Sequence, residues 1–135
     1  MAPREAAVVC VVVGVLVRDG SLLLVRRAPW MRVFPGAWGP FGGHVDSGET
    51  VEEALRREAR EELGIEVIAL RHLGQVYVPV EPALAHVFAV LSWGGEPENA
   101  APDEHTDVRW FGLTELPDSR ALDAYGTLIE APPGS

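Results

Sequence analysis

Apolar runs with the length and composition of β-strands alternate along the chain with short polar or glycine-rich segments. Residues 8–17 form a run rich in β-branched side chains, which turns at Asp19-Gly20 into a second apolar run at residues 21–27, so the two are expected to pair as a hairpin. Further strands are expected at residues 66–78 (one bent strand or two short ones), 84–93 and 107–111. A final helix, weakened by an interior glycine, is expected at residues 119–130.

Two segments lack these patterns. Residues 28–43 are rich in Pro, Gly and Trp and are expected to form a loop long enough to suggest a functional role, and residues 94–105 read as a polar loop. Strands therefore flank one central helix, with no repeat, linker or low-complexity tract between them. This organisation predicts a single domain over residues 1–135, of the mixed α/β class.

The central helix is predicted with sharp ends, at residues 51–63. Thr50 followed three residues later by Glu53 is a capping-box pattern, which makes Val51 the first helical residue, and Gly64 is a natural left-handed stop. At about 100° per residue, one side of this helix is apolar and is expected to be buried. That side contains Val51, Ala54, Leu55, Ala59 and Leu63.

The same helix carries many glutamates, and some of them fall on the apolar side. A solvated face with ion pairs, the usual explanation for a charged helix, accounts for Glu52, Glu53, Arg56 and Arg60. It does not account for Glu58 and Glu62, which lie inside the apolar sector, or for Glu61 at its edge.

Clustered carboxylates at this end of a helix are unfavourable without a cation. Glu61 and Glu62 lie in the last turn, where the helix dipole disfavours negative charge, and partly buried carboxylates repel one another. Carboxylate oxygens select Mg²⁺ or Mn²⁺ rather than zinc, for which the sequence offers no Cys/His set. The pattern therefore predicts a divalent-metal site.

Composition and charge limit the classes of molecule that the protein is expected to bind. The formal net charge of −9 argues against nucleic acid or an anionic membrane as the main partner, but it allows a small anion held through a metal ion. The single Cys10 excludes an internal disulfide and suits the cytoplasm. Residues 8–17 are too few to span a bilayer, and the signal-peptide alternative lacks a small-residue cleavage site.

The glycine loop and the helix together resemble the complete Nudix box of the Nudix hydrolase family. The matching positions are Gly43, Glu49, Arg57, Glu58, Arg60 and the run Glu61-Glu62-Leu63-Gly64-Ile65. Ala59 departs from the bulkier aliphatic residue that is usual there, and WGPFGG replaces the commoner proline-glycine-glycine entry. Residues 97–117 also resemble the tail of many small Nudix enzymes.

The resemblance implies an α/β/α sandwich with a mixed β-sheet and an enzyme that cleaves a pyrophosphate bond in a nucleoside diphosphate linked to another group. The cofactor implied is Mg²⁺, for which Mn²⁺ can substitute. Glu58 and Glu62 would be the main metal ligands, with the Gly43 carbonyl completing the coordination. Glu61 would be a further ligand or part of the apparatus that activates water.

Three other charged residues receive roles from the resemblance. Arg57 would orient Glu58 by ion pairing, and Glu49 would brace the loop around the ligands. The general base differs between family members, so Glu58, Glu61 and a carboxylate outside the box, Glu104, all remain candidates.

Candidate contacts to the substrate lie outside the box. Trp30, Phe34 and Trp38 in the loop before it could stack on a base or sugar, although loop aromatics equally often pin a loop by packing. His44 in the glycine loop and His86 on an expected strand are further candidates, with an ordinary packed histidine as the alternative for His86. The remaining histidines, His72 and His105, are expected at the surface.

Several functions remain open at this point. A nucleoside triphosphate or a modified nucleotide is the favoured substrate, and ADP-ribose or a nucleotide sugar is the alternative. Some enzymes that act on nucleotide sugars carry a proline at a set distance past the box, and Pro79 and Pro82 lie on either side of that position. A non-catalytic nucleotide-binding module is disfavoured because the charged residues of the box are intact. The oligomeric state is not determined, a homodimer being among the alternatives.

Overall fold

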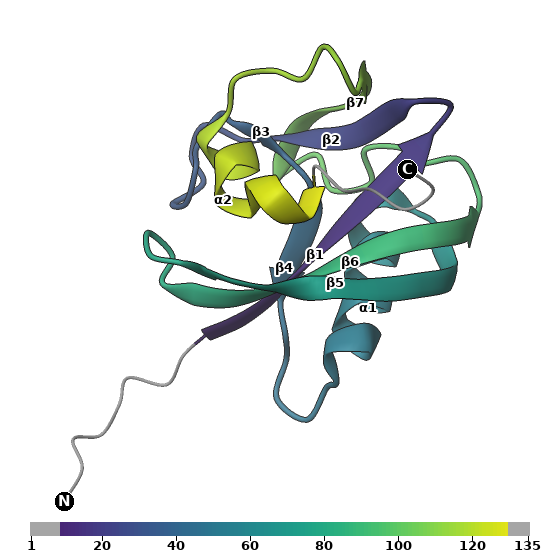
Figure 1. The fold of residues 1–135 in the computed structure, drawn as a ribbon. Helices are drawn as coiled ribbons and strands as arrows, with labels where there is room; N and C mark the ends of the chain where they lie inside the picture. The colour runs from purple at the N-terminus through teal and green to yellow at the C-terminus, as the bar shows by residue number, and fades with distance from the viewer. Residues whose placement is uncertain (1–8, 130–135) are drawn as a thin grey trace, which may run out of the picture.

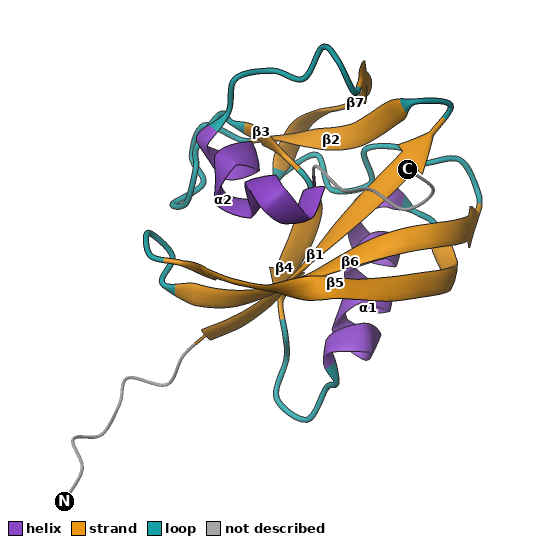
Figure 2. Ribbon diagram, in the orientation of Figure 1, coloured by secondary structure: helices purple, strands orange, loops and turns teal. Residues whose placement is uncertain are grey.

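A computed structural model describes residues 9–129, in which the chain forms seven strands and two helices (Figures 1 and 2). The expectations for Val8 and Glu130 lie outside the described residues. The elements are β1 (Val9–Arg18), β2 (Ser21–Arg27), β3 (Trp38–Gly39), β4 (Phe41–His44), α1 (Val51–Leu63), β5 (Glu66–Val78), β6 (Ala83–Gly94), β7 (His105–Gly112) and α2 (Arg120–Ile129).

The sheet is mixed and divides at β1. The strand order is β3-β2-β1-β6-β5, with β4 also pairing with β1 and β7 with β2. β1 runs parallel to β6 along most of its length, whereas its other edge pairs antiparallel with β4 in the first half and with β2 only at Val17 and Arg18. Because β1 changes partners on this edge, β4 and β2 belong to two different branches of the sheet (Figure 2).

Alternating side chains of β1 divide the interior into two cores. Val12 and Leu16 pack with the apolar face of α1 on one side, and Val11, Val13 and Val15 pack with residues of α2 on the other. α2 contacts β3 on one branch of the sheet and β5 on the other (Figure 1). The predicted α/β/α sandwich with a mixed sheet is therefore confirmed.

The prediction for the central helix is confirmed at both ends. The Thr50 side chain accepts a hydrogen bond from the Glu53 amide, and the Glu53 side chain accepts one from the Thr50 amide, which completes the capping box. Gly64 ends the helix in the left-handed conformation, with φ of 69°. These ends determine which residues of the helix face the sheet.

The prediction of an unbroken loop at residues 28–43 is wrong. The segment contains the short strands β3 and β4, and Gly42 and Gly43 pair with Val13 and Val12 of β1. A Cβ at Gly42 would lie 2.1 Å from the Val12 carbonyl oxygen, so the close approach of these strands requires glycine there.

The later elements differ from the predictions only in extent. β5 is one strand with irregularities in its pairing to β6, rather than two, and β6 and β7 are each longer than expected. Neither helix of the described chain has the length and apolar character that crossing a bilayer would require.

Candidate active site

Two carboxylates of α1 point toward the sheet. Glu62 is 1% exposed, and the side chain of Glu58 is 12% exposed, so both lie on the buried side of the helix as the periodicity predicts. Within residues 9–129, neither carboxylate oxygen of Glu62 accepts a hydrogen bond. A buried carboxylate without donors costs free energy, and it therefore indicates a missing electropositive partner.

Gly43 makes room for the second carboxylate. β4 passes so close to α1 that a Cβ at Gly43 would lie 2.5 Å from Oε2 of Glu58 and 2.6 Å from Oε1. The Glu58 carboxylate thus lies directly against the backbone of the glycine loop, in the space that any other side chain at residue 43 would fill.

Arg57 connects the acids of α1 to the loop that precedes the helix. Its guanidinium donates to both carboxylate oxygens of Glu49 at 2.8 and 3.0 Å, and to the backbone carbonyl of His44 at 2.9 Å. The same group donates to Glu58 at 2.7 Å and to Glu61 at 3.0 Å. The ion pair of Arg57 with Glu58, which the resemblance implies, is therefore present.

Glu49 also ties the loop to itself. Its Oε1 accepts a hydrogen bond from the Asp46 amide at 3.0 Å, so the carboxylate joins Arg57 to the turn before the helix. The hydrogen bond from Arg57, followed by that from the Asp46 amide, lowers the pKa of Glu49. Glu49 is thus held as an anion that fixes Arg57.

The carboxylates of α1 do not by themselves form a complete metal-coordination site. In the described part of the chain, no three His, Cys, Asp or Glu side chains converge closely enough to surround an ion, and Glu61 is half exposed and turned to Arg57. The donor set nevertheless fits a hard divalent cation. One carboxylate of α1, Glu58, lies against the backbone of Gly43, and a second, Glu62, is buried without a hydrogen-bond donor.

Burial raises the pKa of both Glu58 and Glu62 well above the ordinary value. Removal from water is the largest cause for each residue, and the two carboxyl groups also act on one another. The Arg57 guanidinium opposes the shift of the pKa of Glu58 but does not cancel it. Without a cation, the pair therefore retains protons that ordinary carboxyl groups would lose.

This protonation predicts how the stability of the metal-free protein depends on pH. The folded state holds protons that the unfolded state releases above its ordinary pKa of about 4.5, so the free energy of unfolding should fall as pH rises from there through neutral pH. Urea unfolding in a chelator at pH 5.5 and pH 8 measures the effect. Glu62→Gln should flatten the dependence, and a wild-type protein that is equally stable at both pH values would contradict the interpretation.

His105 is buried beside Glu62, and the expectation that it lies at the surface is wrong. It is 3% exposed, and its Nε2 lies 3.1 Å from Oε1 of Glu62, although out of line for a hydrogen bond. The Asn99 side chain donates to the His105 carbonyl at 2.8 Å, and the Ala100 amide donates to the Glu62 carbonyl at 3.0 Å. The loop between β6 and β7 therefore binds the last turn of α1 and holds an imidazole against its buried acid.

A cavity of about 120 Å³ opens beside the glycine loop, between the two branches of the sheet. Gly43, His44 and Glu104 line it, so it adjoins the carboxylates of α1. Its walls also include residues that were not predicted from the sequence to belong to the site, namely Arg27, Met31, Val33, Glu81 and Tyr125.

The predicted aromatic contacts lie outside this cavity, apart from Phe34, which lines it. Trp30 is exposed and donates from its indole nitrogen to the Asp103 carbonyl at 2.9 Å, which ties the loop before β3 to the loop before β7. Trp38 packs edge-on against Phe111, with ring centroids 4.9 Å apart. The backbone carbonyl of Trp38 accepts a hydrogen bond from the hydroxyl group of Ser119, the residue just before α2.

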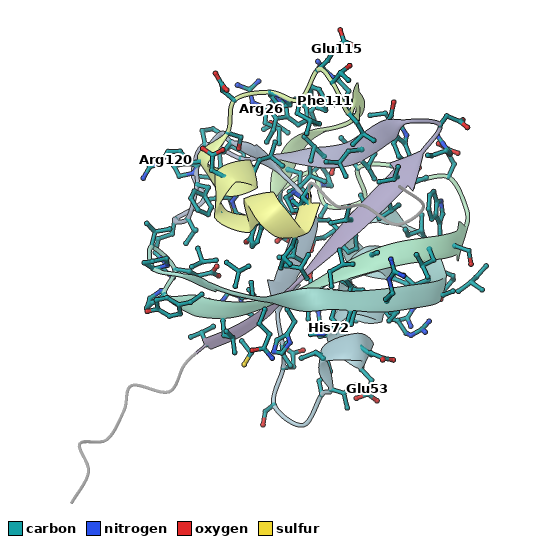
Figure 3. All side chains as sticks on the ribbon, in the orientation of Figure 1. Arg26, Glu53, His72, Phe111, Glu115 and Arg120 are labelled. Atoms are coloured by element: carbon teal, nitrogen blue, oxygen red, sulfur yellow. The ribbon has the colours of Figure 1, made fainter. Side chains whose placement is uncertain are left out.

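The two predicted histidines are placed differently. His44 lines the cavity, with its Nε2 3.7 Å from a Glu81 carboxylate oxygen. His86 lies on the same side of β6 as Phe88 and Val90, which pack toward α1, and its Nδ1 is 3.2 Å from Nε2 of His72. His72 is an exposed residue of β5 and is labelled in Figure 3. Burial, with a smaller contribution from the charge of His72, lowers the pKa of His86. His86 does not line the cavity, so its role in binding substrate stays a prediction.

The packing of Trp38 indicates what its removal should do. Trp38→Ala would remove the contact with Phe111 and the Arg109 guanidinium, which lies 5.2 Å from the ring centroid. We expect the free energy of unfolding to fall by about 2 kcal/mol, with an unchanged Michaelis constant in the folded molecules. Urea unfolding and kinetics on one preparation measure both. A rise of tenfold or more in the Michaelis constant at unchanged stability would instead support stacking on the substrate.

Comparisons with known proteins agree with this geometry. The family model described as NUDIX domain matches residues 8–130. The crystal structure of a MutT NUDIX hydrolase from Burkholderia pseudomallei superposes with a TM-score of 0.78 at 33% identity, covering 91% of this chain and 97% of that one.

Two curated relatives match over shorter stretches. The NAD-capped RNA hydrolase NudC of Pseudomonas aeruginosa is 38% identical over 105 residues, which are 76% of this chain and 36% of that protein. The nucleoside triphosphatase NudI of Escherichia coli is 48% identical over 65 residues, which are 48% of this chain and 44% of that protein. The chain thus spans less than half the length of either relative.

Proposed function

The chain belongs to the Nudix family, and from this premise we propose that it is a Mg²⁺-dependent pyrophosphohydrolase of small nucleotides. Its substrate would be a nucleoside triphosphate or a modified nucleotide. In the reaction, water adds to a phosphorus atom of the diphosphate, and the bridging P–O bond to the leaving group breaks.

The observation that carries this proposal is the pair of buried carboxylates on α1, one of which lies against Gly43. Both oxygens of Glu62 are buried without a donor, and the Glu58 carboxylate lies against the glycine backbone. Glu58 and Glu62 would hold the ion, with the Gly43 carbonyl and Glu61 as further ligands. When bound, a divalent ion supplies positive charge for the diphosphate and lowers the pKa of the attacking water.

The surrounding residues have distinct tasks in this account. Arg57 holds Glu58 and is itself fixed by Glu49, so the aim of Glu58 depends on the loop before the helix. The hydrogen bonds to Glu49 and Glu58 raise the pKa of Arg57, which keeps the guanidinium charged. Glu104 lines the cavity and is our candidate for the group that takes the proton of the attacking water, with Glu58 and Glu61 as alternatives.

The name of one relative supports a nucleoside triphosphate as the substrate. The E. coli relative, 48% identical over 48% of this chain, is named a nucleoside triphosphatase. ADP-ribose or a nucleotide sugar remains the alternative, because Pro79 and Pro82 lie on either side of the position at which some enzymes acting on such substrates carry a proline.

A hydrolysis screen tests the proposal. The purified protein would be assayed against nucleoside triphosphates, ADP-ribose, nucleotide sugars and dinucleoside polyphosphates, each with Mg²⁺, with Mn²⁺ and with excess chelator. We expect turnover of at least one nucleoside triphosphate that stops in chelator and returns when metal is restored. Equal turnover in chelator would contradict the metal dependence, and turnover confined to nucleotide sugars would select the alternative substrate.

A further inference from the structure

The cavity beside Gly43 contains an acid that the proposed chemistry does not use. Glu81, in the turn between β5 and β6, lines the cavity together with Tyr125 of α2. The Glu81 side chain is only 14% exposed. Burial, with a smaller contribution from the nearby charge of Glu81, raises the pKa of Tyr125 to about 12, so the phenol stays neutral beside this carboxylate.

The Glu81 carboxylate accepts no hydrogen bond within the described residues. Among the described residues, the basic side chain that comes within 4 Å is the His44 ring, whose Nε2 lies 3.7 Å away, beyond hydrogen-bond distance. A largely buried carboxylate is unfavourable unless donors reach it. The cavity therefore offers a strong acceptor to a ligand that brings an N–H group.

Part of the cavity wall suits a flat apolar ring. Val11 and Val13 of β1 and Phe34 of the loop between β2 and β3 form this part, and Arg27 and Glu104 line the cavity as well. The cavity volume is about 120 Å³. A dry cavity of roughly 150 Å³ is known to hold benzene, so a single six-membered ring is of the right size, with the rest of the ligand outside.

We propose that Glu81 selects the base of the substrate by accepting a hydrogen bond from an exocyclic amino group. Cytosine, which presents an amino group, would be favoured over uracil, which presents a carbonyl oxygen at the same position of the ring. Two acceptors cannot pair, so a carbonyl there would leave both it and Glu81 without a donor. This inference rests on the proposed function, because it assigns the base end of the same substrate.

Matched pairs of substrates isolate the amino group. CTP and UTP differ at ring position 4, which carries an amino or an oxo group, and at the adjacent N3, which carries a hydrogen only in uracil. ATP and ITP differ in the same way at position 6 and N1 of a double ring. We expect kcat/KM to be about tenfold to a hundredfold higher for CTP than for UTP, the range for a hydrogen bond to a charged group. Because the cavity fits a single six-membered ring, we expect the preference for ATP over ITP to be weaker than that for CTP over UTP.

The variant Glu81→Gln keeps the shape but should remove the discrimination, because its amide can accept from an amino group or donate to a carbonyl oxygen. The preference for the amino base should fall below about threefold, chiefly because kcat/KM for the oxo base rises. Glu66→Gln is the matched control, since Glu66 is an exposed acid of β5 that pairs with Arg60 on the surface. It should keep the wild-type preference, and melting temperatures should show that both variants fold.

The outcomes separate this inference from the proposed function. Absence of metal-dependent turnover of every nucleotide would refute the proposed function itself. Turnover with equal kcat/KM for amino and oxo bases, or a preference that Glu81→Gln leaves intact, would overturn only the role of Glu81. If the wild type prefers the amino base in either pair and Glu81→Gln abolishes that preference, the role of Glu81 is supported. A preference between CTP and UTP would identify a single-ring base, and one between ATP and ITP a double-ring base.

Discussion

Glu62→Gln and Glu58→Gln should each lower kcat by about a hundredfold or more, because each removes a charge that the proposed cation would need while keeping the shape of the side chain. Glu62 is buried with both oxygens free of hydrogen-bond donors in the described chain, and its raised pKa shows that neighbouring groups do not fully compensate its charge, so the proposed cation would do so. Steady-state kinetics in Mg²⁺, together with the Mg²⁺ concentration that gives half-maximal rate, measure the loss.

Both variants should fold. In the absence of metal they remove a buried carboxyl group whose pKa is raised by burial, so their melting temperatures in chelator should equal or exceed that of the wild type. Glu52→Gln serves as the control, because it changes an exposed acid in the first turn of the same helix. Full turnover by either variant, or an equal loss in Glu52→Gln, would refute the metal assignment.

Gly43→Ala should damage activity far more than it damages folding. The new Cβ would lie 2.5 Å from the Glu58 carboxylate, which is the flexible end of a side chain and can swing away. We expect at least a tenfold loss of kcat/KM, since Glu58 would leave its place against the glycine backbone, and a loss of unfolding free energy of about 1 kcal/mol or less.

The adjacent glycine provides the contrast. In Gly42→Ala the new Cβ would lie 2.1 Å from the Val12 carbonyl oxygen, which belongs to the paired backbone of β1 and cannot move alone. The unfolding free energy should therefore fall by about 3 kcal/mol. Urea unfolding and kinetics on both variants test the pair of expectations. If Gly43→Ala retained full activity, or if both variants lost stability equally, the close packing of Glu58 on Gly43 would not matter to function.

Local signals were enough to predict α1 and its buried acids. Thr50, Glu53 and Gly64 act within one turn of the helix ends, so the residues that face the sheet follow from the periodicity alone. The Asp19-Gly20 turn and the apolar runs likewise predicted β1 and β2, because strand propensity and turn chemistry agree there. The buried positions of Glu58 and Glu62 could therefore be inferred without a structure.

Features that depend on distant segments could not be predicted in this way. β4 is a strand because β1 pairs with it, although its glycines have little preference for a strand. His105 ends a polar loop, and only the contacts of that loop with the last turn of α1 bury it beside Glu62. Glu81 and Tyr125 come from separate elements that meet only when α2 covers the divided sheet, so no pattern in the sequence links them.

Glu58, Glu62 and the Gly43 carbonyl are the groups proposed to hold a divalent cation. Crystals of the protein grown or soaked with Mn²⁺, measured at a wavelength where manganese scatters anomalously, locate that ion directly and independently of any assay. The account predicts an anomalous peak between the two carboxylates and within coordination distance of the Gly43 carbonyl, and it predicts that the peak disappears in Glu62→Gln. A peak that persists there in Glu62→Gln, or Mn²⁺ bound only elsewhere in crystals of a protein that Mn²⁺ activates, would contradict it.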